Sequence, residues 1–171
     1  MRLTRLSPRR TCLIVCLVIY ACGVFEYHVR ATANKIFGNM SYLTDCPYIA
    51  EKVTLVNGQR TIWNCRLHVS MHYQGQYVYG DFNRDGLTDA AVVIGESQGG
   101  SDDSRLLAFL ISDGTQLVHR QSEYLGNSAI VKSLKEHDGK IITDMFEHQE
   151  GDCMAGPTKR VKNVYAYVSA N

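Results

Sequence analysis

The hydrophobic residues of this chain fall into many short runs, and polar residues with Gly or Asn separate each run from the next. Short apolar or alternating runs with turn residues between them are typical of antiparallel β domains. No stretch from residue 46 to residue 171 shows a sustained helical period. The pattern predicts a mostly β fold, α+β at most: a single antiparallel domain, sheet-like or sandwich-like, built of hairpins and preceded by an N-terminal hydrophobic helix.

The expected strands differ in the pattern of their two faces. Residues 67–73 alternate apolar with polar side chains, which predicts a strand with one wet face. Residues 90–94 and 106–111 are continuous apolar runs, which predict strands that are buried on both faces. Further strands are expected at residues 53–56, 60–63, 76–79, 116–119, 130–135, 140–146 and 161–168.

Two dipeptides between β-prone runs predict tight hairpin turns. Asn57-Gly58 separates residues 53–56 from residues 60–63, and Asp138-Gly139 separates two later runs. Both central residues of a type I′ turn need positive φ, which Asn, Asp and Gly adopt most readily. We therefore expect each dipeptide to join two paired strands.

The N-terminal segment has the charge pattern of a targeting signal. Four arginines lie in the first ten residues, and residues 12–25 form a nearly unbroken apolar run. A basic start followed by such a run is typical of a signal peptide or membrane anchor, although it is shorter than the roughly 20 residues that span a bilayer. Three fates stay open: cleavage after Ala31-Thr32-Ala33, lipidation of Cys22 in a lipobox-like sequence, or retention as an anchor.

Each of these fates places the rest of the chain outside the cytoplasm, on the side opposite the arginines. The expected organisation is a signal peptide or membrane anchor at 1–25, a linker or short helix at 26–45, and a β domain at 46–171. An oxidising compartment would allow two of the three cysteines in the β domain to form a disulfide. The spacing leaves the pairing of these candidates open: Cys46, Cys65 and Cys153.

Charge argues against nucleic acid as a partner. All four N-terminal arginines precede the first acidic residue, Glu26, so the chain beyond residue 21 has 14 basic and 17 acidic side chains. Binding to nucleic acid needs a basic surface. The chain also lacks a CxxC sequence, so the cysteines give no support to a zinc ribbon or a redox motif.

Residues 79–94 contain oxygen-bearing side chains at the spacing of a calcium loop. Calcium prefers six to eight oxygen ligands, which a curling loop supplies from alternate positions. Gly86 follows the third of these positions, where such a loop turns sharply, and Val92 stands where an EF-hand has its bidentate Glu. The sequence therefore predicts a structural Ca²⁺ site with an affinity on the order of 10⁻⁴–10⁻³ M. Its expected ligands are Asp81, Asn83, Asp85, the carbonyl of Leu87, and Asp89. The alternative is a tight turn whose Asp and Asn side chains bond their own backbone.

The DxNxDGxxD loop resembles the loop of FG-GAP and related extracellular β repeats. It occurs once here, so a propeller of tandem blades is excluded. From about Val53 to Tyr167 the chain resembles small exported bacterial proteins of unknown function that have a single FG-GAP-like loop, and this resemblance implies export without implying an activity. It is carried by Gly80–Val93, Gly95–Ser104, Leu125–Asn127, Asp138–Ile141, Asp152-Cys153 and Pro157-Thr158.

Other polar groups suggest chemistry at lower specificity. The carboxylates of Glu147, Glu150 and Asp152 could form the acid pair of a glycosidase, and His148 with Cys153 could form a nucleophile and base. His68 and His72 would need a third ligand to hold zinc. Three alternating tyrosines favour packing on a sheet face over a sugar platform; they are Tyr73, Tyr77 and Tyr79.

These observations predict a non-enzymatic protein of the cell envelope, in the periplasm or otherwise outside the cytoplasm, and held at the inner membrane if the N-terminal segment is retained. The expected role is a binding or structural module with one calcium site, and the expected partner is an envelope protein or a glycan. Two alternatives stay open. One is a small envelope hydrolase that uses carboxylates near Glu147–Asp152, and the other is an inhibitor of a secreted enzyme.

Overall fold

The structure is a computed structural model that describes residues 29–44, 52–63, 68–99, 103–152 and 156–169. It confirms the prediction of a mostly β, antiparallel fold. Residues 29–37 are helical, and ten strands follow within the described ranges. The strands are β1 Ser41–Leu43, β2 Lys52–Thr54, β3 Gln59–Trp63, β4 His68–Gly80, β5 Asp89–Ser97, β6 Ser104–Ser112, β7 Leu117–Asn127, β8 Ile130–His137, β9 Lys140–Glu147 and β10 Lys159–Ala166.

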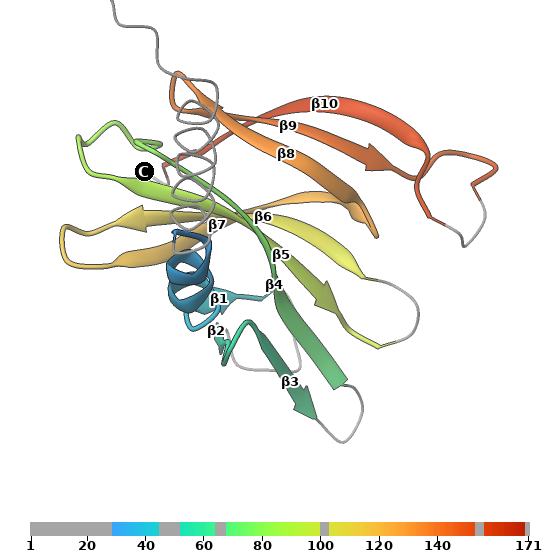
Figure 1. The fold of residues 1–171 in the computed structure, drawn as a ribbon, viewed down its shortest axis with the longest axis horizontal. Helices are drawn as coiled ribbons and strands as arrows, with labels where there is room; N and C mark the ends of the chain where they lie inside the picture. The colour runs from blue at the N-terminus through green and yellow to red at the C-terminus, as the bar shows by residue number, and fades with distance from the viewer. Residues whose placement is uncertain (1–28, 45–51, 64–67, 100–102, 153–155, 170–171) are drawn as a thin grey trace, which may run out of the picture.

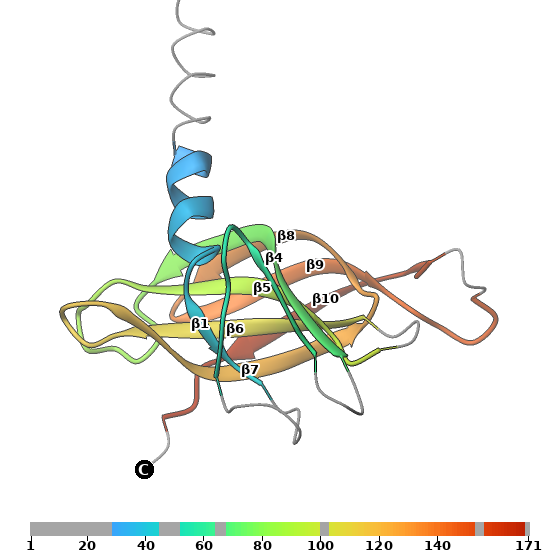
Figure 2. The same cartoon turned by 90° about the horizontal axis from the view of Figure 1, so that it is seen from below.

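The strands form three antiparallel sheets. A five-stranded sheet in the order β3-β4-β5-β6-β7 lies in the middle of the molecule, as Figure 1 shows. A three-stranded sheet, β10-β9-β8, covers one of its faces. The short β1-β2 pair and the helical residues 29–37 cover the other face, and Figure 2 shows the helix rising away from the sheets. The fold is thus a β sandwich with a second, smaller cover.

The middle sheet separates two hydrophobic cores. Side chains of a strand point alternately to its two faces, and β5 illustrates this directly. Ala90, Val92 and Ile94 pack toward the helix and β1-β2, whereas Ala91 and Val93 pack toward the three-stranded sheet. Strand β6 divides its side chains in the same way. The continuous apolar runs predicted at 90–94 and 106–111 therefore form the two strands that are buried on both faces.

Phe37 is the principal contact between the helix and the middle sheet. Its side chain is fully buried, and its ring centroid lies 5.8, 5.3 and 6.0 Å from those of Tyr73, Tyr77 and Tyr79. These three tyrosines come from one face of β4. The interpretation that they pack against a sheet face is confirmed. The chain then turns back through β1, where the buried Tyr42 donates a hydrogen bond to the Phe37 carbonyl at 2.8 Å.

The two predicted hairpin turns have different outcomes. Asp138-Gly139 joins β8 to β9 with both residues at positive φ, as expected. Asn57-Gly58 also has two positive φ values, but the prediction that it joins two paired strands was wrong. Only the Val56–Gln59 bridge closes that turn, because β2 pairs with β1 and β3 pairs with β4.

The structure describes only part of the N-terminal region for which a targeting segment and a short helix were predicted. Residues 29–37 agree with a short helix in the 26–45 segment, and β1 shows that strand structure also begins within it. No helix in the described ranges is long and apolar enough to cross a membrane. The apolar run 12–25 and the cysteines at 22, 46, 65 and 153 lie outside the described residues.

Replacing Phe37 by Ala should destabilise the domain by roughly 3–5 kcal/mol, since it leaves a cavity among the tyrosines of β4. Ile36→Ala is the matched control, because Ile36 is 43% exposed in the same helical turn. Urea denaturation of the full chain in detergent measures the free energy of unfolding of both variants. Equal losses in the two variants would mean that the helix contributes little to the core.

Candidate functional site

The acidic loop between β4 and β5 is closed by its own hydrogen bonds. The Asp81 carboxylate accepts the backbone N–H of Asp85 at 3.1 Å and that of Gly86 at 3.0 Å. The Asp85 carboxylate accepts the N–H of Leu87 at 2.8 Å and the Asn83 amide at 2.7 Å. Gly86 has φ +85°, a conformation that favours glycine. These are the bonds expected of an Asp-rich turn.

Asp89 has a structural role that the sequence did not reveal. Its side chain is fully buried, and its two carboxylate oxygens accept the N–H of Phe82 at 2.9 Å and the N–H of Ser112 at 2.8 Å. The first bond fixes the start of the acidic loop, and the second fixes the end of β6. Asp89 therefore connects the loop to the neighbouring strand, and its oxygens point into the protein.

The fit of this loop to calcium depends on its other oxygens. A carboxylate offers about four lone-pair sites, so Asp81 and Asp85 keep acceptor capacity beyond the N–H groups they bind. Asp89 likewise accepts one N–H group on each oxygen, and it differs from Asp81 and Asp85 in being fully buried. Within the described ranges no group of three or more His, Cys, Asp or Glu side chains is placed to hold a metal ion. The calcium site therefore remains a prediction, with Asp81, Asn83, Asp85, the Leu87 carbonyl and Asp89 as its expected ligands.

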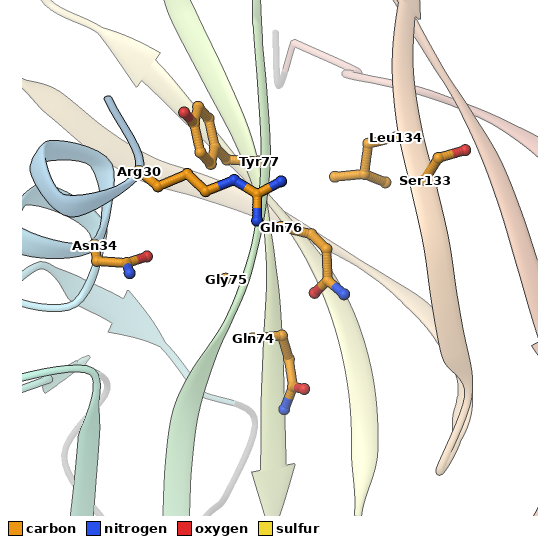
Figure 3. Close-up of a pocket in the computed structure, with 8 residues that line it drawn as sticks. All are labelled: Arg30, Asn34, Gln74, Gly75, Gln76, Tyr77, Ser133 and Leu134. Carbon is orange, nitrogen blue, oxygen red and sulfur yellow. The ribbon is translucent and has the colours of Figure 1, made fainter. Parts of the chain in front are cut away.

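A polar groove of about 600 Å³ lies where the helix, β4 and β8 meet. Figure 3 shows two helical residues on one side of it, two β8 residues on the other, and a short stretch of β4 between them. The lining residues include three with carboxamides, two with hydroxyl groups and one with a guanidinium, and none of them has a carboxylate. The lining residues are Arg30, Asn34, Gln74, Gly75, Gln76, Tyr77, Ser133 and Leu134.

A bulge in β4 supplies the centre of this groove. Tyr73 pairs with Ile94 of β5 and Tyr77 pairs with Val92, so β4 uses two more residues than its partner between these pairs. Residues 74–76 have no registered partner in β5, and Gly75 adopts φ +82°. Bulges redirect side chains and often occur beside functional sites. Here the bulge places two glutamines between the helix and β8.

The glutamine on the β8 side is held in place. Gln76 Nε2 donates to the carbonyl oxygen of Val131 at 3.2 Å. Its Oε1 is buried and accepts no hydrogen bond from any residue that the structure describes. An unpaired buried acceptor is uncommon in native proteins and calls for a partner such as a water or a ligand group. The carboxamide is therefore oriented before any ligand arrives.

The bulge has a signal in the sequence. Gln74-Gly75-Gln76 interrupts an otherwise β-prone stretch, and a glycine inside a strand often marks a bulge or a close backbone approach. Sequence reasoning ended one strand at residue 73 and began another at residue 76. The structure joins both into β4.

The carboxylates proposed for a hydrolase are bound to neighbouring groups. Glu147 pairs with Lys159 at 2.9 Å. Asp152 accepts the Thr158 hydroxyl, the N–H of Thr158 and the N–H of Gln149. These bonds, first of all that from the Thr158 hydroxyl, lower the pKa of Asp152 and favour the ionised form, which cannot act as a general acid. Neither residue lines the groove.

The two histidines of β4 have separate contacts. His68 lies against the Trp63 ring with centroids 4.8 Å apart, and His72 Nε2 lies 4.0 Å from the Asp103 carboxylate. Burial is the main cause that lowers the pKa of His72. Neither histidine belongs to a group of three or more His, Cys, Asp or Glu side chains that could hold a metal ion in the described ranges. The proposed partner of His148, Cys153, is outside those ranges.

Comparisons with known proteins return nothing: no family model, no curated protein and no solved structure matches this chain. The resemblance to exported proteins with an FG-GAP-like loop therefore stays a prediction.

Asp89→Ala should lower the free energy of unfolding by roughly 2–4 kcal/mol, because it leaves two N–H groups without the charged acceptor that they now share. Asp138→Asn is the control, since the Asp138 side chain is 80% exposed. Chemical denaturation in chelator isolates this effect from any bound ion. A loss no larger than that of the control would contradict the bridging role of Asp89.

Asp85→Ala tests the calcium prediction. With about 10 mM calcium and an affinity in the expected range, bound ion would stabilise the wild type by about 1–3 kcal/mol, or roughly 3–10 °C in Tm. The variant should lose this increment in calcium and change little in chelator. Equal losses in both conditions, read from thermal melts, would mean that the loop is only a turn.

Proposed function

We propose that this chain is a non-catalytic binding protein of the cell envelope, and that its β4 groove binds a glycan. The observation that carries the proposal is the lining of the groove: the carboxamides of Asn34, Gln74 and Gln76 lie beside the Arg30 guanidinium, with no carboxylate among the lining residues. Carboxamides both donate and accept hydrogen bonds, as the hydroxyl groups of a sugar do. The volume of the groove lies within the usual range of ligand sites.

The arrangement of the groove supports binding in a fixed orientation. The bulge is held between two packed layers, and Gln76 is oriented by its bond to Val131. Pre-organised polar groups lose less conformational entropy when a ligand binds. Tyr77 and Leu134 add apolar surface beside the amides, which suits the alternating polar and apolar faces of a sugar ring.

The envelope location rests on the N-terminal charge pattern, which is typical of an exported or anchored protein. In the proposal the segment before residue 26 directs the domain out of the cytoplasm or holds it at the membrane. The acidic loop has a structural role, with Ca²⁺ as its proposed ion. The loop is separate from the groove, so loss of the ion would act through stability instead of direct contact with the ligand.

Binding of the full chain in detergent to an array of neutral and acidic glycans tests this function. The double variant Asn34→Ala/Gln74→Ala removes two side chains that line the groove. Each lost hydrogen bond costs about 0.5–1.5 kcal/mol, so affinity should fall roughly 5- to 100-fold. Gln59→Ala is the matched control, because Gln59 is exposed on the edge strand β3.

Two results would contradict the proposal. One is unchanged affinity in the groove variant, and the other is hydrolysis of a bound glycan by the wild type. Hydrolysis that disappears in Glu147→Gln would instead favour the hydrolase alternative.

A further inference from the structure

The outward face of the three-stranded sheet carries a concentration of positive charge. We call this surface the basic face. Side chains alternate along its strands, so those next to the core residues Ile141 and Met145 point away from the protein. All five of its lysine and arginine residues are exposed. The basic face comprises Lys132 and Lys135 of β8, Lys140, Ile142, Asp144 and Phe146 of β9, and Arg160, Lys162 and Val164 of β10.

The register places its cations mainly on the two outer strands. Lys135 pairs across Ile142 with Val164, and Lys162 pairs with Asp144. Lys132 Nζ lies 5.7 Å from the centre of the Phe146 ring. On this face the middle strand alternates charged Lys140 and Asp144 with apolar Ile142 and Phe146. The strands β8 and β10 are separated by about 10 Å, twice the usual strand spacing.

Asp144 is the one carboxylate among the residues of the basic face. Arg160 binds Asp144 through two hydrogen bonds, at 2.8 and 2.5 Å. The bonds from Arg160, with the charges of Lys162 and Lys135 nearby, lower the pKa of Asp144. Asp144 therefore stays ionised, and its negative charge offsets the positive charge of Arg160. The five cations of this face therefore outnumber its one carboxylate, which lies opposite Lys162 and is bound by Arg160.

This surplus is notable because the chain beyond residue 21 is acidic, with 14 basic and 17 acidic side chains. Charges of one sign on a single face repel each other and destabilise the folded state, although solvent reduces the cost. Their separation from the acidic remainder gives the molecule a positive surface to which an anion can bind.

We propose that the basic face binds a polyanionic glycan, a polysaccharide with carboxylate, phosphate or sulfate groups along its chain. Two rows of cations can pair with anionic groups on both sides of an extended chain. The less polar ring faces of that chain can lie on Ile142 and Phe146, which stand on either side of the Asp144 carboxylate that Arg160 binds. None of the five cations lines the groove. The inference therefore goes beyond the proposed function and does not depend on it.

Two other polyanions fit the surface less well. Insertion into a bilayer needs several protruding apolar side chains. Of the three apolar residues of the basic face only Val164 is exposed, whereas Ile142 and Phe146 are half-buried. Double-stranded nucleic acid presents dense charge over a long stretch and would meet the acidic remainder of the molecule. A single flexible glycan chain can follow the small face without this repulsion.

Binding of the full chain in detergent to heparin and to polygalacturonate, with neutral dextran as the blank, tests the proposal. The wild type should bind both polyanions, with affinity that falls as salt rises. Lys135→Gln/Lys162→Gln should reduce affinity at least tenfold and reduce the slope of log K against log salt by roughly 1.5. Lys35→Gln/Lys52→Gln is the control, since it makes the same charge change at exposed positions on the helix and β2.

The same measurement with nanodiscs of phosphatidylglycerol and with a DNA duplex decides between polyanions. Tighter binding to either of these than to the glycans would overturn the choice of ligand. An equal loss in the control variant, or binding that salt does not weaken, would overturn the site itself. If the double variant unfolds in a thermal melt, the single variant Lys135→Gln replaces it, and unchanged affinity there also counts against the proposal.

Discussion

A middle sheet that is apolar on both faces is the constraint on which the structure depends. Strand β5 is buried along almost its entire length, so the fold must supply two separate covers. The three-stranded sheet covers one face, and the helix with β1-β2 covers the other. Without a cover, the aliphatic residues of β5 and β6 would be in contact with water, which is unfavourable. Each face of the middle sheet must therefore pack against apolar side chains of its cover. The edges and turns of the molecule follow from this layering.

The close approach of β4 to β8 is one consequence. At Gly80 an added Cβ would lie 2.8 Å from Glu136 Cγ and 2.7 Å from the Phe82 ring, so the chain needs a glycine there. Four residues earlier, the Gln76 side chain reaches the backbone of β8. The long strand β4 therefore belongs to the middle sheet and also borders the three-stranded cover. Its bulge lies where these two roles meet, which places the polar groove at that junction.

The sequence predicts strands well where burial alone determines them. The continuous run 90–94 and the Asp138-Gly139 turn are decided by local chemistry, and both appear as expected. Pairing depends on tertiary contacts. The Asn57-Gly58 turn forms, yet β2 pairs with β1 because Val53 packs in the core between the helix and the middle sheet. The alternation of apolar and polar residues along a strand shows which face of the sheet is buried, but it does not show which element covers that face. The number of layers could therefore not be predicted from the sequence.

The candidate sites show the same division between local and tertiary information. The spacing of Asp81, Asn83 and Asp85 is a local property, and the loop indeed curls as that spacing suggests. Asp89 looks like another member of the series in sequence, but its position beside β6 gives it a backbone partner at Ser112. The groove and the basic face are formed by segments that are far apart in the chain, so no short sequence motif predicts either of them.

The separation of these surfaces carries a physical argument about their ligands. The groove is lined by groups that are mostly neutral, so binding there would depend on hydrogen-bond geometry and little on salt. The basic face is flat, exposed and charged, so binding there would depend on charge density and strongly on salt. The two proposed sites would thus respond differently to salt.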